Sequence, residues 1–265
     1  MLTGYCTFRG CESTLWKCEN SEHYSIFYHP DSTAEKELIH IVEWQEKCFQ
    51  KLSYELDMTL DHPIRMYLCD SPEEIAQTTG CPACNGMTFD YDLIYAVYNE
   101  SVRCLGPHED AHLFSYQIAI PESFFLREGF AMYFDECYHG RHNAEIAKEW
   151  FQSKKLFSIT SLIDNRVFRL LPENISYPLA GAFVSWIIQS YGITKYLEVY
   201  RNGGDFSNSI SLSSAAIDSM FKSAMTENKE GCSWQEGISS KRVSSIWIKG
   251  EWVYQQAPIA PPPLF

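Results

Sequence analysis

The stretch HYSIFYHPDSTAEKELIHIVEWQEKCFQKLSYEL, residues 23–56, sets the fold class, because it joins a strand to a long helix. Residues 23–29 alternate polar and apolar side chains, which is the period-two pattern of a β-strand. Ser32 and Glu35 then have the spacing of a capping box, which marks the start of a helix. Apolar side chains follow at helical intervals, at Ala34, Leu38, Ile41, Cys48, Leu52 and Leu56.

Two more strands are predicted further along the chain, at residues 63–69 and 92–99. Between them, Ser71 and Pro72 are typical of the cap and the first turn of a short helix, and Glu74 completes a second capping box with Ser71. From about Cys104 onward the pattern is helical, through HEDAH, LREGFAMYFDECY, NAEIAKEWFQSKK, YPLAGAFVSWIIQSYG and ITKYLEVYR. Gly192 is predicted as the C-cap of the fourth of these helices, and SIWIKGEWVY as a small hairpin that turns at Lys249–Gly250. We therefore predict an α+β fold, with a small mixed sheet in an N-terminal lobe, a mainly helical C-terminal lobe, and a functional cleft between them.

The composition excludes several classes of partner. The chain has 265 residues, with 34 acidic against 21 basic side chains and a formal charge of −13, which disfavours nucleic acid and anionic membranes. No apolar run approaches the roughly 18 residues of a membrane span. The first residues lack the pattern of a signal peptide, which favours the cytoplasm and leaves secretion open if a leader has been removed.

Ten cysteines are many for a cytosolic chain. Cys48 and Cys69 fall in apolar-periodic segments, where small buried thiols are common. Cys81 and Cys84 form a CPAC motif that could be a redox pair or half of a zinc site, with Cys6 and Cys11 as possible further ligands. A structural or incidental role is the default for these thiols.

The segment Gly106–Glu136 carries a candidate metal site. His108 and His112 are four residues apart, so on a helix both imidazoles can reach one ion, and Glu109 lies beside that face. Catalytic zinc takes three protein ligands, and Glu128, sixteen residues after His112, is the natural third. The alternative is a chance motif on an acidic, aromatic-rich helix.

HEDAH followed by LREGFAMYFDE resembles the gluzincin (peptidase MA) metallopeptidases, and the likeness covers about residues 23–201. The resemblance implies a zincin-like fold with one Zn²⁺ per chain, bound by His108, His112 and Glu128, with Glu109 as the general base. Arg127 stands where the aminopeptidases of this clan have Asn, and their Gly-x-Met-Glu-Asn motif is absent. An endopeptidase is therefore expected.

The resemblance also suggests a donor for the oxyanion. In the clan's aminopeptidases a Tyr at the start of a helix, in a Tyr-x-x-Gly pattern, has this role. Here Tyr177 precedes Pro178 and is followed by Gly181 one residue later than that pattern, so Tyr177 is predicted at a helix cap. Packing at the helix end is an equal alternative, and Arg127 or His142 could replace it as donor.

Five other side chains near the motif have ordinary structural interpretations beside functional ones. His139 and His142 are expected in a solvated loop, and Phe130 and Tyr133 in the core. Asp135 could hydrogen-bond a ligand histidine or lie on a solvated face. Residues 92–99 are either a substrate-binding edge strand or an ordinary buried strand.

The function we expect is zinc-dependent hydrolysis of a peptide or protein substrate. The alternatives are a zinc hydrolase of a small amide or ester, and a non-catalytic binding module on the same fold. The expected organisation is an extension at 1–22, a catalytic domain at 23–205, and a C-terminal helix, hairpin and proline-rich tail at 206–265. The pattern indicates no oligomeric state.

Overall fold

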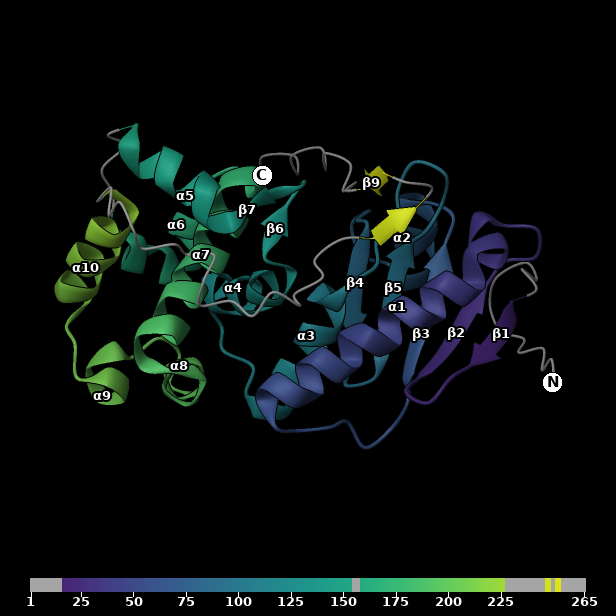
Figure 1. Cartoon of the computed structure of the whole chain (residues 1–265), viewed down its shortest axis with the longest axis horizontal. Coiled ribbons are helices and arrows are strands. Elements are labelled where there is room, and N and C mark those ends of the chain that lie inside the picture. Colours follow the sequence, from purple (N-terminus) through teal and green to yellow (C-terminus); the bar gives the residue numbers. More distant parts are fainter. Residues whose placement is uncertain (1–15, 154–157, 227–245, 249–250, 254–265) are drawn as a thin grey trace. The chain divides into compact units, whose positions relative to one another are not determined.

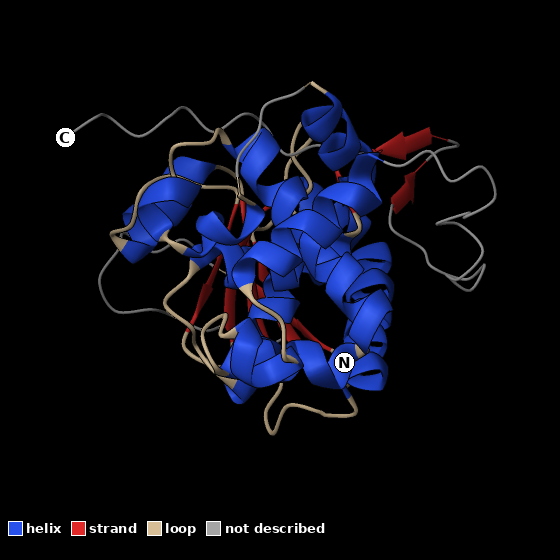
Figure 2. Cartoon of the chain, turned by 90° about the vertical axis from the view of Figure 1, so that its left-hand side faces the viewer, coloured by secondary structure: helices blue, strands red, loops and turns tan. Residues whose placement is uncertain are grey.

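The computed structural model describes residues 16–153, 158–226, 246–248 and 251–253, and its architecture is α+β, as predicted (Figure 1). The chain divides into two compact units, residues 1–114 with 246–265, and residues 115–245. Figure 2 separates the strands from the helices by colour. An N-terminal mixed five-stranded sheet with helices is followed by a mainly helical part.

The first unit is built on the sheet. Its elements are β1 (Lys17–Asn20), β2 (Tyr24–Tyr28), α1 (Thr33–Leu56), β3 (Ile64–Cys69), α2 (Pro72–Thr79), β4 (Gly86–Phe89), β5 (Leu93–Val97) and the start of α3 (Pro107–Ile118). The strand order is β1-β2-β3-β5-β4, with β2, β3 and β5 parallel and β1 and β4 antiparallel at the edges. The three strands predicted from the sequence are confirmed, and β1 and β4, each four residues long, are additional.

The position of β5 resolves one alternative. β5 pairs with β3 on one side and β4 on the other, so it is the ordinary buried strand, and β4 is the edge strand. The predicted C-terminal hairpin is confirmed as β8 (Ile246–Ile248) paired with β9 (Glu251–Val253). Its predicted turn at Lys249–Gly250 and the proline-rich tail lie outside the described residues.

Both predicted capping boxes are present in a variant form, in which the glutamate accepts from the N–H of the residue before the N-cap. Ser32 Oγ accepts from the Glu35 backbone N–H at 3.1 Å, and the Glu35 carboxylate accepts from the Asp31 N–H at 2.6 Å. The same arrangement starts α2, with Ser71 and Glu74. These local hydrogen bonds explain why the sequence located the starts of α1 and α2 correctly.

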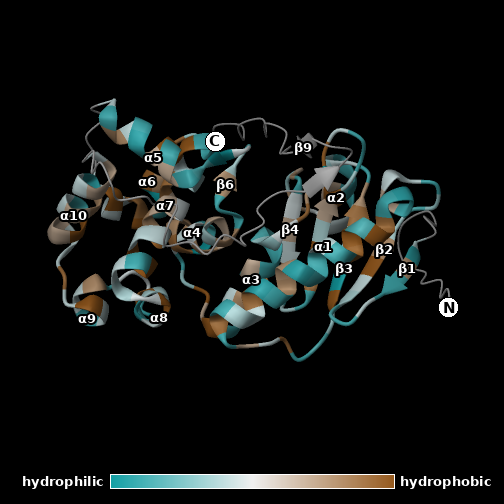
Figure 3. Cartoon of the chain, viewed as in Figure 1, coloured by the Kyte–Doolittle hydropathy of each residue, from teal (hydrophilic) through white to brown (hydrophobic). Residues whose placement is uncertain are grey.

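One face of the sheet is held by a ladder of aromatic rings. Phe27 and Tyr67 are register partners on β2 and β3 and stack at 4.4 Å, and Tyr67 stacks on Tyr95 of β5 at 5.2 Å. Phe89 of β4 meets Tyr95 edge-on at 6.0 Å. Each such pair adds about 0.5–1.5 kcal/mol beyond its buried area. Figure 3 shows brown, hydrophobic segments in β2 and β3, as expected for parallel strands buried on both faces.

The second unit is mainly helical. Its described elements are α4 (Phe124–Asp135), β6 (Cys137–Tyr138), β7 (Arg141–His142), α5 (Asn143–Gln152), the 3-10 helix η1 (Ile159–Ile163), α6 (Asn165–Phe168), α7 (Glu173–Tyr191), α8 (Ile193–Arg201), α9 (Phe206–Ile210) and α10 (Ser214–Thr226). Gly192 ends α7 with φ of 84°, as predicted for a helix C-cap. Within the described part of the chain, the structure has no helix that is long and apolar enough to cross a membrane.

Helices α4 and α7 approach closely because glycine lies at their contact. A Cβ at Gly129 of α4 would lie 2.9 Å from Val184 Cγ2 and 3.0 Å from the Ala180 carbonyl oxygen. A Cβ at Gly181 of α7 would lie 2.7 Å from Met132 Cβ. Any larger side chain at either glycine would push the two helices apart.

Candidate metal centre

The two motif histidines lie in the first two turns of α3, in the first unit. The ring centroids of His108 and His112 are 5.1 Å apart, with the planes at 82°. His108 is half-buried and His112 is buried. The structure therefore brings this pair together on one helix face, as the four-residue spacing predicts.

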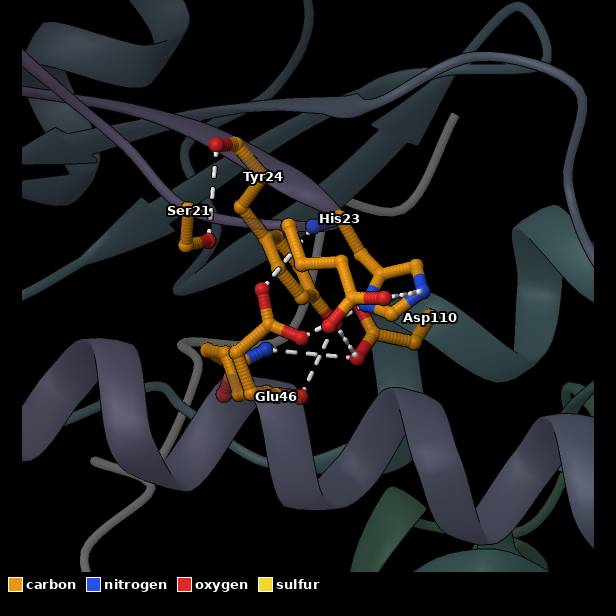
Figure 4. Close-up of polar contacts among 7 residues, drawn as sticks. Ser21, His23, Tyr24, Glu46 and Asp110 are labelled. Carbon is orange, nitrogen blue, oxygen red and sulfur yellow. Dashed lines mark hydrogen bonds and ion pairs between the residues drawn. The ribbon is translucent and has the colours of Figure 1, made fainter.

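The first turn of α3 is anchored by Asp110, for which the sequence motifs predict no role. Asp110 is fully buried, and its Oδ2 accepts from the Tyr24 hydroxyl at 2.6 Å and from Gln45 Nε2 at 3.3 Å. Figure 4 shows Tyr24 of β2 directed toward Asp110 beside α1. Burial and the nearby Asp110 raise the pKa of Tyr24, so the phenol stays a hydrogen-bond donor.

A signal for Asp110 does exist in the sequence. Two residues along a helix turn the side chain by about 200°, so Asp110 points away from the face that carries His108 and His112. Ala111 and Phe114, which follow it, are both fully buried. An acidic side chain directed into that apolar region requires a donor, which Tyr24 and Gln45 provide.

Glu109 is held against the edge strand β4. The Thr88 hydroxyl lies 2.7 Å from Glu109 Oε2 and 3.2 Å from the Glu109 carbonyl oxygen. A Cβ on Gly86 would lie 2.5 Å from Glu109 Oε1, so the carboxylate rests directly against the glycine backbone. Neither contact follows from the sequence, because the pattern of residues 86–89 predicts no strand.

Glu128 lies in the second unit, half-buried on α4 and next to the packing residue Gly129. Burial and then the negative charge of Glu128 raise the pKa of Glu173 on α7. Phe130 and Tyr133 on the same helix are core residues, as predicted.

Tyr177 is not at a helix cap, so that prediction was wrong. Helix α7 begins at Glu173, after Pro172, which places Tyr177 and Pro178 inside the helix. Pro172 precedes the first turn and Glu173 has the charge that favours a helix N-terminus, and these two residues determine the start. Tyr177 is half-buried with its ring 6.0 Å from that of Phe168.

Helix packing explains the glycine in the Tyr177-to-Gly181 pattern. Gly181 lies where α7 meets α4, and a Cβ there would come within 2.6 Å of Asn143 Nδ2. The glycine is therefore required by helix packing, whatever Tyr177 does. The alternative donors differ in setting: Arg127 lies over the Phe124 ring at 4.6 Å, and His142 is exposed.

The other described histidines near acidic groups are already engaged. His23 Nδ1 lies 2.6 Å from Glu46 Oε2, and His29 Nε2 lies 2.5 Å from Glu74 Oε1. Each pair belongs to a group that could in principle hold a cation, but the imidazole is satisfied by its carboxylate. His139 is exposed, as expected for the loop between β6 and β7.

Within the described residues the cysteines are thiols and form no disulfide, namely Cys18, Cys48, Cys69, Cys81, Cys84, Cys104 and Cys137. Burial, with the charges of Glu109 and Cys81, raises the pKa of Cys84 to about 11, which makes it a poor nucleophile at neutral pH. Cys48 and Cys69 are buried, as predicted, while Cys6 and Cys11 lie outside the described residues.

No protein-family model matches the chain, and no curated protein shows a significant match to it.

Proposed function

We propose that this protein hydrolyses peptide bonds with one zinc ion held by His108, His112 and Glu128, and with Glu109 as the general base. The observation that carries the proposal is the arrangement at the start of α3. The ring centroids of His108 and His112 lie 5.1 Å apart on one helix face. The carboxylate of Glu109, which lies between them in the sequence, contacts Thr88 of the edge strand β4.

The donor set suits zinc of the catalytic kind. Each of the three residues offers one ligand atom, an imidazole nitrogen from each histidine and a carboxylate oxygen from Glu128. Two histidines and one glutamate leave one tetrahedral position open for water or substrate.

When bound, zinc supplies a Lewis acid that lowers the pKa of water and polarises the scissile carbonyl. Glu109 accepts the proton of the attacking water and delivers it to the leaving amide nitrogen. Tyr177, which lies inside α7, is our candidate donor of a hydrogen bond to the developing oxyanion, and packing is its alternative role. Strand β4, paired on one side only among the described strands, can bind the substrate backbone in extended form.

An endopeptidase fits the chain better than an aminopeptidase. Arg127 precedes Glu128, and the strand residues Gly86, Met87, Thr88 and Phe89 carry no acidic side chain to hold a free amine. The substrate class we propose is therefore an internal peptide bond in an extended segment.

The test is hydrolysis of casein by zinc-loaded protein. We expect the Glu109→Gln variant to keep its zinc and to lose at least about 10²-fold in kcat, because the amide is nearly isosteric but cannot accept the proton. The matched control is Glu43→Gln, at an exposed position of α1.

The outcomes separate the proposed function from its alternatives. Cleavage of a small ester without cleavage of casein would indicate a hydrolase of small substrates. Zinc binding with no hydrolysis of either substrate would indicate a binding module. Loss of zinc in Glu109→Gln would contradict the ligand assignment.

A further inference from the structure

Two of the four residues of strand β4 lie against Glu109, namely Gly86 and Thr88. In a strand, alternate residues share a face, so Gly86 and Thr88 lie on one side of the sheet and Met87 and Phe89 on the other. Phe89 packs into the apolar cluster that contains Tyr95. The opposite face, which carries Gly86 and Thr88, is the one in contact with Glu109.

Thr88 contacts one carboxylate oxygen and Gly86 the other. The Thr88 hydroxyl has a single proton, and its 2.7 Å distance to Glu109 Oε2 is shorter than its 3.2 Å distance to the Glu109 carbonyl oxygen. Because the closer acceptor is charged, the hydroxyl donates to the carboxylate. A Cβ at Gly86 would also lie 2.9 Å from Cys104 Sγ, so there is no room for a side chain there and the Glu109 carboxylate packs against the Gly86 backbone.

We propose that Thr88 is a positioning residue for the reaction, and that it fixes the orientation of the Glu109 carboxylate in the space that Gly86 leaves open. The proposal rests on the proposed function, in which Glu109 transfers the proton. A carboxylate on a flexible side chain can rotate, and a general base that rotates away from the water is ineffective. The hydroxyl on one oxygen and the glycine backbone against the other restrict that rotation.

The experiment compares Thr88→Val with Thr88→Ser. Valine keeps the shape and removes the donor, whereas serine keeps the donor. For Thr88→Val we expect kcat on casein to fall about tenfold or more, with KM changed less than about twofold and zinc content unchanged. Thr88→Ser should stay within about threefold of the wild type. The matched control is Thr78→Val, at an exposed position of α2.

A second pair of variants tests whether Thr88 acts through Glu109. Gly86→Ala leaves Thr88 in place and displaces the carboxylate from the other side, so it should show the same fall in kcat. In a Glu109→Ala background, Thr88→Val should lower the residual rate by less than about twofold, because the group that it orients is gone. A full additional loss in that background would overturn the proposal.

A third measurement needs neither zinc nor activity. In metal-free protein labelled with ¹³C at glutamate Cδ, the resonance missing from Glu109→Gln identifies Glu109. That resonance should move in Thr88→Val and stay in place in Thr78→Val. A wild type that binds zinc but cleaves nothing would defeat the proposed function alone. An unmoved Glu109 resonance, or near-native kcat in Thr88→Val, would defeat the role of Thr88.

Discussion

Tyr24 of β2 donates a hydrogen bond of 2.6 Å to Asp110 of α3, although the two residues are 86 positions apart in the chain. Both side chains are fully buried. Asp110 is flanked in sequence by Glu109 and Ala111 and lies between the two motif histidines. This hydrogen bond therefore ties the helix that carries the candidate metal ligands to the sheet.

The Tyr24–Asp110 bond should contribute measurably to stability. Tyr24→Phe leaves the buried Asp110 carboxylate without its closest donor, at a cost of about 1.5–3 kcal/mol in the free energy of unfolding. We expect a fall in Tm of about 2–4 °C for each kcal/mol. The measurement is thermal unfolding, with Tyr54→Phe as control because Tyr54 is 88% exposed. Equal Tm values for the two variants would show that the bond adds nothing.

Zinc binding should depend on three residues and not on their neighbours. Elemental analysis of purified protein should find about one zinc per chain, and His108→Ala and Glu128→Ala should each lose it. Glu122→Ala, at an exposed position six residues before Glu128, should keep it. His112→Ala should also lower Tm, since His112 is buried.

Failure would take one of two forms. No transition metal after incubation with zinc would remove the basis of the proposed function. Full zinc content in Glu128→Ala would leave the two histidines as ligands and require a different third residue.

Tyr177→Phe should lower kcat on casein by roughly 10²-fold or more, with zinc content and KM little changed, if the phenol donates to the oxyanion. The control is Tyr191→Phe, at the other end of the same helix α7. A near-native kcat for Tyr177→Phe would reduce Tyr177 to packing against Phe168, and the donor would then be sought at Arg127 or His142.

The His29–Glu74 pair should make stability depend on pH. Burial would lower the pKa of His29, but the hydrogen bond and charge of Glu74, with Asp70, outweigh it and raise the pKa above 6.5. Burial likewise opposes ionisation of Glu74, yet its hydrogen bonds to His29 and to the Asp70 N–H lower its pKa below 4.5.

The signs fix the pH window. Because folding raises the pKa of His29, the protonated imidazole stabilises the folded state. This contribution is complete below pH 6.5 and is lost as the pH rises through the pKa of His29 in the folded state. Because folding lowers the pKa of Glu74, the ionised carboxylate stabilises the folded state above pH 4.5. This contribution is lost as the pH falls through the pKa of Glu74 in the folded state. The difference in Tm between the wild type and His29→Gln should therefore be largest between pH 4.5 and 6.5 and shrink at higher pH. His40→Gln, at an exposed position on α1, is the control, and a pH-independent difference for His29→Gln would refute the linkage.

The sequence alone was sufficient wherever the interacting residues are three or four positions apart. The capping boxes at Ser32 and Ser71, the end of α7 at Gly192 and the shared face of His108 and His112 were all predicted correctly. In each case helix geometry converts a fixed spacing into a fixed contact, so no knowledge of the rest of the chain is needed.

Contacts between distant residues required the three-dimensional structure. Strand β4 is short and begins at a glycine, so its sequence pattern did not predict a strand. Thr88 of this strand and its partner Glu109 are 21 positions apart in the chain. The start of α7 was misplaced because Pro178 suggested a first turn that Pro172 and Glu173 supply instead. The sequence pattern does not pair Asp110 with Tyr24, which lies 86 positions away in the chain. A hydrogen bond of this kind depends on how the whole chain folds, because the spacing between its partners has no fixed geometry, and only the folded backbone brings the donor to the acceptor.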